Sequence, residues 1–244
     1  MMNEEGSLPL LAQELDGLAE SLVERGASLE AILVDDGSTD RTADVARALV
    51  AERRGWRLLS HTTNRGFGAG LRTGVADARG DVIVSYDADC AYPAADVLLL
   101  LDVLASGADV ASATPFADDA EADAAVWRLG LSRACSLAYR MALRGRARGI
   151  RTFTCAFRAY RAETLRAAAW KADGFLAAAE IVAHCLLAGA RVVEVPSRLR
   201  PRVAGVSKMK IVRTTFAHAG LLARLALTRS VARQPPVAAG ANVA

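Results

Sequence analysis

The stretch Ala31-Ile32-Leu33-Val34-Asp35-Asp36-Gly37-Ser38-Thr39-Asp40 determines how the rest of the chain is interpreted. It is a short apolar run that ends abruptly at carboxylates and glycine, which is typical of a buried parallel strand. The run Val82-Ile83-Val84-Ser85-Tyr86 ends in the same way, at Asp87-Ala88-Asp89. Ligands of open α/β sheets bind where such strands stop, and two acidic clusters there repel each other unless a cation or a donor-rich ligand lies between them. The two runs therefore predict a site for a divalent metal that holds a nucleotide diphosphate.

Strand-like and helix-like segments alternate along most of the chain. Ser7 is the expected cap of the first helix, and Pro93 is the expected first residue of the fourth. The succession predicts an α/β fold with a doubly wound, mostly parallel sheet flanked by helices. We expect strands at about 30–35, 57–61, 81–86, 108–113 and 191–195, extended chain over Thr152–Tyr160, and helices at about 8–25, 40–53, 66–79, 93–106, 124–145, 161–171, 174–189 and 211–233.

With 244 residues and 52% hydrophobic content, the chain is long enough to bury a full core. We expect one α/β domain over 1–210, a basic amphipathic helix over 211–233 and a disordered tail over 234–244. No run of 18 uncharged apolar residues predicts a transmembrane helix, and the N-terminus lacks the pattern of a secretory signal. The expected localisation is cytoplasmic, with a peripheral position on the inner face of the cell membrane left open. Four cysteines without CxxC spacing favour reduced thiols over a disulfide or zinc site: Cys90, Cys135, Cys155 and Cys185.

Charge is divided unevenly between the two halves of the chain. Residues 1–127 contain 23 Asp and Glu against 9 Arg, whereas residues 128–244 contain 4 acids against 21 Arg and Lys. A half this basic indicates an anionic partner, namely a phosphate, an anionic membrane surface or a nucleic acid. Nucleic acid has the least support, because no RNP-like or helix-turn-helix motif occurs and aromatic residues are only 5%. The helix over 211–233 suits either an anionic bilayer or packing against the sheet.

Six motifs, in their order and spacing, resemble family 2 glycosyltransferases of the GT-A fold. Within that family the likeness is to polyprenyl- or dolichol-phosphate sugar synthases, and it extends from Asn3 to about Arg224. The resemblance implies a GT-A, Rossmann-like sheet flanked by helices. It also implies an inverting, Mg²⁺- or Mn²⁺-dependent enzyme that transfers a sugar from a nucleotide-diphosphate sugar to a polyprenyl phosphate. The motifs are Asn3-Glu4-Glu5-Gly6, Val34–Asp40, Asn64–Gly70, Asp87-Ala88-Asp89, Cys155–Arg161 and Gly205-Val206-Ser207-Lys208.

The resemblance also assigns the donor site. Asp36 is expected to accept hydrogen bonds from the ribose or base, while Asp35 orients the turn. Alternate residues of an extended segment point to one side, so Asp87 and Asp89 can share one metal ion, with Asp89 also counted as catalytic. The alternative for the Asp35-Asp36 pair is a helix-capping turn, which explains one carboxylate but not both. The full donor set implied by the resemblance is Glu4, Val34, Asp36, Asp87, Ala88 and Asp89.

The metal and glycine motifs each depart from a familiar pattern. Members of the resembled family often carry Gln where this chain has Ala91, so the metal is expected to depend more on water and phosphate ligands. Gly66, Gly68 and Gly70 do not complete G-x-G-x-x-G, because Leu71 stands where the last glycine is required. We therefore expect a tight, partly donor-facing loop and no nicotinamide cofactor.

The basic half is expected to bind the acceptor. The resemblance implies that Arg202 and Lys208 contact the donor diphosphate or the acceptor phosphate as catalytic residues, with Arg133 and Ser207 beside them. Arg and Lys hold phosphate through charge-assisted hydrogen bonds. The alternative for these cations is a solvated basic surface. Glu180 is the candidate general base if the acceptor is a hydroxyl, although a role in orienting Arg or Lys, or a place facing solvent, is favoured for it. A lipid phosphate is already a nucleophile and needs no base.

Two alternatives to a polyprenyl-phosphate transferase remain open: the same fold acting on a saccharide or other hydroxyl, and a shortened, non-catalytic relic. Proteins of the resembled family carry an apolar strand ending in Pro-x-Tyr before the motif that is Asn3-Glu4-Glu5 here, and Met1-Met2 occupies that place. We expect the true start to lie upstream. Without that strand the sheet loses a central member and leaves backbone groups unpaired on both neighbours. Low stability or weak donor binding is the expected result.

Overall fold

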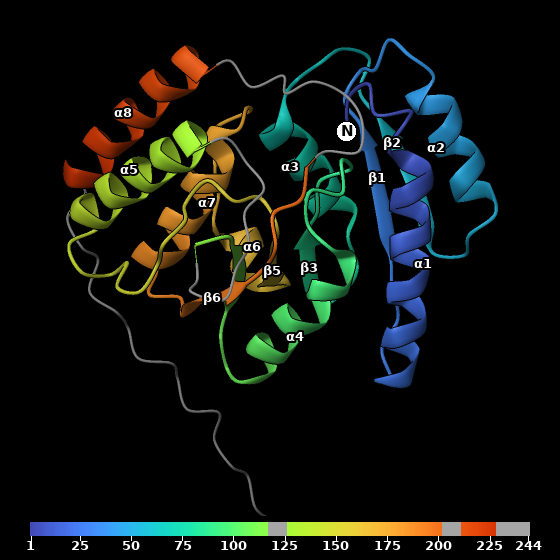
Figure 1. Ribbon diagram of the computed structural model, residues 1–244, viewed down its shortest axis with the longest axis horizontal. Helices are drawn as coiled ribbons and strands as arrows, with labels where there is room; N and C mark the ends of the chain where they lie inside the picture. The colour runs from blue at the N-terminus through green and yellow to red at the C-terminus, as the bar shows by residue number, and fades with distance from the viewer. Residues whose placement is uncertain (117–125, 202–210, 228–244) are drawn as a thin grey trace, which may run out of the picture.

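The computed structural model describes residues 1–116, 126–201 and 211–227, and its helices flank two β-sheets (Figure 1). The first sheet pairs β1 (Ala31–Asp35) with β2 (Trp56–Ser60) in parallel. The second has the strand order β3 (Val82–Ser85), β5 (Arg158–Arg161), β4 (Val110–Thr114) and β6 (Val192–Pro196). The helices are α1 (Leu8–Glu24), α2 (Thr42–Ala51), α3 (Phe67–Asp77), the 3₁₀ turn η1 (Ala94–Asp96), α4 (Val97–Ala105), α5 (Val126–Ala142), α6 (Ala162–Ala167), α7 (Leu176–Leu187) and α8 (Ile211–Leu227).

The α/β fold is confirmed, but three local features differ from the prediction. Of the extended chain expected over Thr152–Tyr160, only its end enters a sheet, as β5, which lies between β3 and β4 and runs antiparallel to both. Ser7 does not cap α1, because its hydroxyl donates to the carbonyl and carboxylate of Glu4, at 3.1 and 3.0 Å. Pro93 precedes a 3₁₀ turn that continues directly into α4, instead of beginning an α-helix.

The sheet is interrupted between β1 and β3. In the described part of the chain these strands belong to separate sheets, so each has an edge without a strand partner. Met1 reaches the open edge of β1: its ammonium donates to the carbonyl of Val34 (2.7 Å), and its own carbonyl accepts the N–H of Asp36 (2.8 Å). This is the pattern by which one residue of a parallel strand brackets its neighbour, here Asp35. The expected absence of a central strand is therefore confirmed.

Two helices hold the separate sheets together. α1 contributes Leu11 to the apolar cluster around β1 and β2, and it contributes Leu18 and Leu22 to the cluster that includes α4 and the second sheet. α3 packs on β1 through small residues: a Cβ on Gly74 would lie 3.5 Å from a methyl group of Val34. Burial of these apolar side chains, and not a continuous hydrogen-bonded sheet, therefore joins the two halves.

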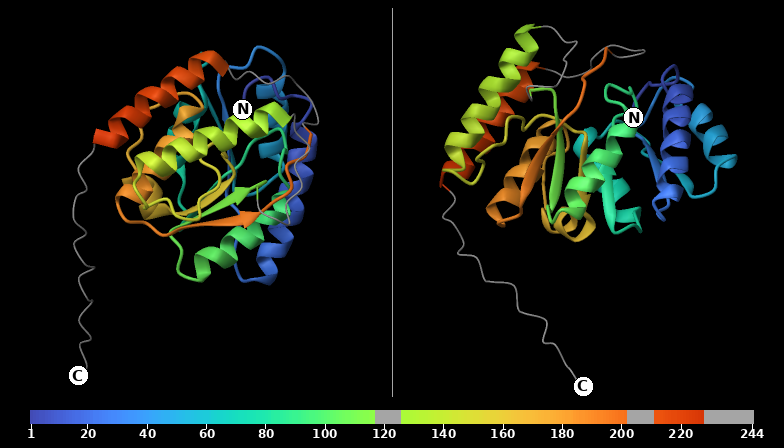
Figure 2. Two further views of the ribbon diagram at one scale, coloured as in Figure 1. Left: turned by 60° about the vertical axis from the view of Figure 1, so that its left-hand side comes forward. Right: turned by 60° about the horizontal axis from the view of Figure 1, so that its bottom comes forward.

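α5 and α8 lie side by side at the end of the molecule opposite α2 (Figures 1 and 2). The hydroxyl of Tyr139 in α5 lies 2.8 Å from Nδ1 of His218 in α8. The sequence suggested one apolar face for α8, but Leu221 and Leu225 are buried among α5 and α7, whereas Phe216 points outward and is 75% exposed. Among the described helices, none combines the length and apolar character needed to cross a bilayer. The predicted residues 228–233 of this helix and the predicted tail 234–244 lie outside the described residues.

Candidate active site

The turn that follows β3 carries Asp87 and Asp89. Asp89 is buried, Asp87 is half-buried, and one oxygen of Asp89 accepts the N–H of Ala91 at 3.1 Å. Cys90 adopts the left-handed conformation with φ +52°, which few side chains other than glycine favour. This sharp reversal turns Ala91 N–H back onto Asp89 and fixes that carboxylate. Asp89 is therefore held by a hydrogen bond from the turn in which Cys90 adopts this conformation.

The turn after β3 lies against β1, because Cys90 and Ala88 join the apolar cluster that contains Ala31 and Leu33. Burial lowers the pKa of the Met1 ammonium below its ordinary value, and the nearby charges of Asp87, Asp36 and Asp35 oppose this effect. That the two acidic clusters share one cation remains a prediction.

Asp36 holds the loop that leads into α3. Its carboxylate lies 2.7 Å from Nδ1 of His61 and accepts the backbone N–H groups of Arg65 (2.9 Å) and Gly66 (2.7 Å). Burial acts to raise the pKa of Asp36, but these hydrogen bonds outweigh burial and keep the pKa below its ordinary value. The other ring nitrogen of His61 lies 2.9 Å from the hydroxyl of Thr73. The carboxylate is therefore ionised and positioned by the protein itself.

The remaining predicted donor residues lie around this pair. The hydroxyl and the N–H of Ser38 donate to Asp35, which shapes the turn after β1. Glu4 points its carboxylate at Ser7 while its N–H donates to Thr42. Val34 faces α3, and Ala88 packs against the apolar cluster around β1. Their contact with a donor remains a prediction.

The glycine-rich segment before α3 does not offer free amides to a phosphate. The N–H groups of Arg65 and Gly66 point at Asp36, and those of Gly68 and Ala69 donate to the carbonyl of Asp173, at 2.6 and 3.1 Å. A Cβ on Gly68 would lie only 2.1 Å from the carbonyl oxygen of Ala172. Gly68 therefore permits a close backbone contact, and a helix-terminus phosphate site of the dinucleotide type is excluded for this segment.

The chain that leaves β6 is tied to the acidic turn. Arg200 N–H donates to the carbonyl of Ala91 (2.8 Å), and the Arg200 guanidinium contacts Glu14 (2.8 Å). The other oxygen of Glu14 accepts the hydroxyl of Tyr86 (3.0 Å) and the N–H of Ala94 (2.8 Å). Glu14 thus fixes both ends of the turn relative to the start of the basic segment. The predicted residues Arg202, Ser207 and Lys208 follow in that segment and lie outside the described residues.

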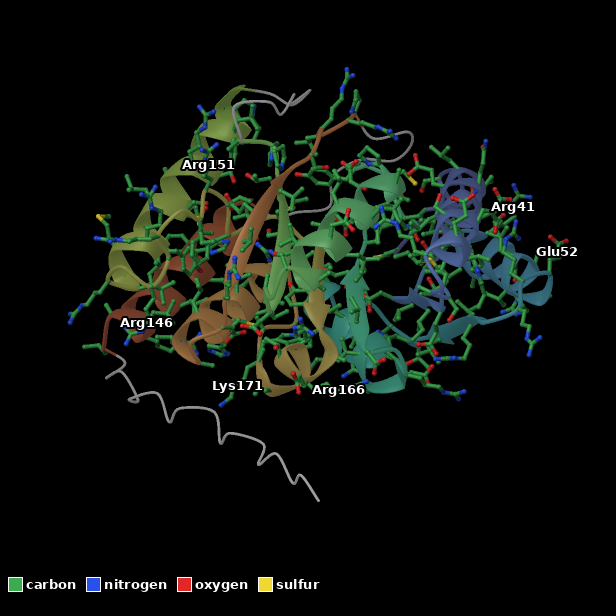
Figure 3. The ribbon with its side chains drawn as sticks, turned by 90° about the horizontal axis from the view of Figure 1, so that it is seen from below. Arg41, Glu52, Arg146, Arg151, Arg166 and Lys171 are labelled. Atoms are coloured by element: carbon green, nitrogen blue, oxygen red, sulfur yellow. The ribbon has the colours of Figure 1, made fainter. Side chains whose placement is uncertain are left out.

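A cationic cavity of about 200 Å³ lies between α5 and the chain ends of β4 and β5. The Arg133 guanidinium stands 4.9 Å from the ring centre of Phe116, and Arg151 donates to the Phe116 carbonyl at 2.9 Å. Ser136 accepts the N–H of Phe153, which leaves its hydroxyl proton for another acceptor. Figure 3 shows Arg151 at the α5 end of the molecule, far from Arg41 and Glu52 at the α2 end. The cavity is lined by Phe116, Arg133, Ser136, Leu137, Arg140 and Arg151.

Residues 3–167 match the family model described as glycosyl transferase family 2. The chain belongs to this family. It is 35% identical over 167 residues to an undecaprenyl-phosphate 4-deoxy-4-formamido-L-arabinose transferase of Pseudomonas paraeruginosa, covering 68% of this chain and 46% of the relative. It is 28% identical over 211 residues to a dolichol-phosphate mannosyltransferase of Pyrococcus furiosus (85% and 57% covered), and 31% identical over 220 residues to a polyprenol monophosphomannose synthase of Mycolicibacterium smegmatis (83% and 80% covered).

Solved structures support the GT-A fold of this family 2 chain. Glucosyl-3-phosphoglycerate synthase of Mycobacterium tuberculosis superposes with a TM-score of 0.65 at 21% identity, covering 94% of this chain and 79% of that one. The identity is low, so the likeness concerns the fold alone. The chain spans about half the length of the first of the relatives above.

Two residues of this family 2 chain have roles that the sequence did not indicate correctly. Glu180, the candidate base, is buried, and its carboxylate accepts the N–H groups of Lys171 (3.0 Å) and Ala172 (2.8 Å), so it supports the loop that caps α3. Arg158 is one of the many arginines of the basic second half, but it is fully buried and donates to Ser112 and to three backbone carbonyls. Arg158 is buried because β5 lies between β3 and β4. Nothing in the sequence indicates that this strand is central.

Proposed function

We propose that this chain transfers a sugar from a nucleotide-diphosphate sugar to a polyprenyl phosphate, with inversion at the sugar. Two observations carry the proposal: Asp36 follows β1 and Asp89 follows β3, and the N–H of Arg200 binds the carbonyl of Ala91, which ties the acidic turn to the segment before residues 202–210. Carboxylates such as Asp87 and Asp89 suit a metal-bound diphosphate, and the cations in the sequence of residues 202–210 suit an anionic acceptor. The names of the relatives support the acceptor class, since all three act on polyprenyl or dolichol phosphates.

Asp87 and Asp89 are the residues that would hold Mg²⁺ or Mn²⁺. In the described residues no third His, Cys, Asp or Glu joins them, so most of the coordination shell is left to water and diphosphate oxygens. That donor set fits Mg²⁺, which keeps several waters and binds through one or two carboxylates plus phosphates. The M. tuberculosis synthase crystallised with Mn²⁺ and UDP-glucose supports a divalent ion of this kind. When bound, the ion would stabilise the leaving diphosphate.

The cavity beside α5 supports a phosphate acceptor. Arg133, Arg140 and Arg151 bring three guanidinium groups to a space of about 200 Å³, and Ser136 contributes a hydroxyl. A phosphate monoester dianion is a nucleophile without further deprotonation, so the site must position it and screen its charge. Glu180 is committed to the backbone of Lys171 and Ala172, which removes the candidate base for a hydroxyl acceptor. These points favour the lipid phosphate over the saccharide alternative.

A polyprenyl phosphate resides in a bilayer, so the enzyme has to work at a membrane surface. We propose a peripheral position on the inner face of the cell membrane for the chain. The cationic second half supports this, because anionic lipids attract basic surfaces.

The test supplies polyprenyl phosphate and, in parallel, simple saccharides together with UDP- and GDP-sugars in Mg²⁺ or Mn²⁺, and follows the labelled product. Labelled lipid supports the proposal, whereas labelled saccharide supports the alternative. Asp89→Asn should lower turnover by about a hundredfold or more while the fold remains intact. Asp81→Asn, an exposed carboxylate at the start of β3, is the matched control and should retain activity. Full activity in Asp89→Asn would reject the metal role.

A further inference from the structure

α5 presents apolar side chains away from the protein core. Leu131, Leu137 and Met141 are exposed by 41, 52 and 66%. At 100° per residue they fall within an arc of roughly 120° on the helix. The buried residues of α5, Tyr139 and Ser136, lie on the other side, facing α8 and the segment that includes Phe153. α5 therefore has a second apolar stripe that the core does not use.

α8 repeats this arrangement beside α5. Phe216 and Leu227 are exposed by 75 and 83% and are eleven residues apart, which places them on the same side about three turns from each other. Leu221 and Leu225 occupy the opposite, buried side. Small residues between the exposed pair, including Ala219, Gly220 and Ala223, are exposed as well. The two helices lie side by side (Figure 2), and each carries exposed apolar side chains on the side away from the core.

Cations border this surface, and carboxylates are missing from its sequence. Arg140, Arg144, Arg146 and Arg148 are exposed on α5 and the turn that follows it. No Asp or Glu occurs between residues 126 and 162 or after Glu194, so α5, its following turn and α8 contain none. Figure 3 shows Arg146 and Arg151 at this end of the molecule. Exposed apolar groups with a purely cationic border are the composition of surfaces that bind anionic lipids.

We propose that the outer faces of α5 and α8 together form a docking surface for an anionic phospholipid bilayer. The exposed apolar residues enter the headgroup boundary, and the arginines contact lipid phosphates. A protein interface has a polar rim whose charges complement the partner and fix its orientation. This surface carries charges of one sign, which favours a uniformly anionic headgroup layer as its partner. The surface of α5 also borders the cavity at Arg140, so a docked chain holds that cavity at the lipid headgroups. That last consequence rests on the proposed function, while docking itself does not.

The first test measures co-sedimentation of the full chain with vesicles of phosphatidylglycerol and phosphatidylcholine, against phosphatidylcholine alone. The chain should bind the anionic vesicles, and Met141→Ser combined with Phe216→Ser should weaken binding by about tenfold or more. Val23→Ser with Leu99→Ser changes two exposed apolar residues elsewhere, 70 and 47% exposed, and should leave binding intact. Because the vesicles contain no polyprenyl phosphate, failure of the transferase proposal does not affect this result.

The charge contribution is tested separately with matched pairs. Arg144→Glu with Arg148→Glu should weaken binding by about tenfold or more, whereas Arg54→Glu with Arg79→Glu changes the net charge equally and should have little effect. Unchanged thermal melting of each variant establishes that it is folded. Equal binding to neutral vesicles, equal losses in both pairs, or no vesicle binding by the unmodified chain would each overturn the docking surface. In the last case, self-association lost in Met141→Ser with Phe216→Ser would identify a second copy as the occupant.

Discussion

Nδ1 of His61 lies 2.7 Å from a carboxylate oxygen of Asp36, and both side chains are almost fully buried. The same carboxylate receives two backbone N–H groups from the loop before α3. The second aspartate of the Asp35-Asp36 pair therefore does structural work in addition to any contact with a donor. A carboxylate that must present one oxygen edge to a ligand gains accuracy when its other contacts are fixed by the protein.

Asp36→Asn should destabilise the protein by about 1–3 kcal/mol, because the amide nitrogen would face N–H donors and leave buried groups unsatisfied. Urea unfolding measures the loss. Asp44→Asn is the control, since Asp44 pairs with Arg47 on the exposed surface of α2 and should change stability by less than about 0.5 kcal/mol. Equal effects of the two substitutions would show that the Asp36 hydrogen bonds do not support the loop.

Gly68→Ala should be strongly destabilising, because its Cβ would lie 2.1 Å from the Ala172 carbonyl oxygen and would push Asp173 off the start of α3. We expect a loss of about 1–3 kcal/mol or more by thermal or urea unfolding. Gly130→Ala in α5 meets no atom within 4 Å and should be neutral or stabilising by about 0.5–1 kcal/mol. A tolerated alanine at 68 would contradict the close packing of this loop.

Stability should fall on mild acidification through His218. Burial lowers the pKa of this ring below its ordinary value, so the folded state stays neutral while the unfolded chain takes up a proton near pH 6.5. The unfolded state then binds more protons, so the stability from this group is present above that pH and decreases as pH falls toward the folded pKa. Melting curves from pH 8 to pH 5.5 should show a smaller decline in His218→Gln than in the unmodified chain. Identical declines would exclude this contribution.

Removal of divalent metal should abolish the thermal stabilisation that a nucleotide-diphosphate sugar gives to the protein. The reason is that the ion would link the diphosphate to Asp87 and Asp89, two carboxylates that repel a diphosphate when no ion is bound; a ligand that no longer binds no longer stabilises the protein. Thermal-shift measurements with EDTA, and then with Mg²⁺ or Mn²⁺ added back, provide the readout. A donor-induced shift that persists in EDTA would separate donor binding from the metal.

A strand fused before Met1 should raise the melting temperature by several degrees, because it would pair with the open edges of β1 and β3. The extension should be apolar and β-branched and should contain five residues, to match the length of β1. A Gly/Ser extension of the same length is the control and should have no such effect. If both extensions melt alike, the open edges are already satisfied in solution.

The sequence predicted most secondary structure because hydrophobic periodicity and chain breakers coincide in this protein. β1 and β3 were found within one or two residues, since each apolar run ends at an aspartate. Strand order was not predictable: β5 joins β3 and β4 through long-range pairing, and its four residues, Arg158 to Arg161, have no alternation of apolar and polar types. Tertiary context alone makes this short, Arg-rich segment a central strand.

The site was predictable in its carboxylates and less so in their contacts. Asp36 and Asp89 were expected at strand ends, and both follow the ends of strands, β1 and β3. The partners of Asp36 could not, because His61 and Gly66 reach it only through the arrangement of the loop before α3. Similarly, Glu180 looked available in the sequence, but the loop at Lys171 and Ala172 folds back over it. Arg202, Ser207 and Lys208 remain predictions.

Because the sheet is interrupted between β1 and β3, the proposed substrate would also connect two separate parts of the protein. Asp35 and Asp36 lie at the end of the two-stranded sheet, whereas Asp87 and Asp89 follow a strand of the four-stranded sheet. A nucleotide that contacts both pairs would therefore bridge the two sheets. Such a ligand would restrict the motion of the two sheets relative to each other while it is bound, and the restriction would end when it dissociates. In this chain, the relative orientation of the two sheets would then set the geometry of the reacting atoms.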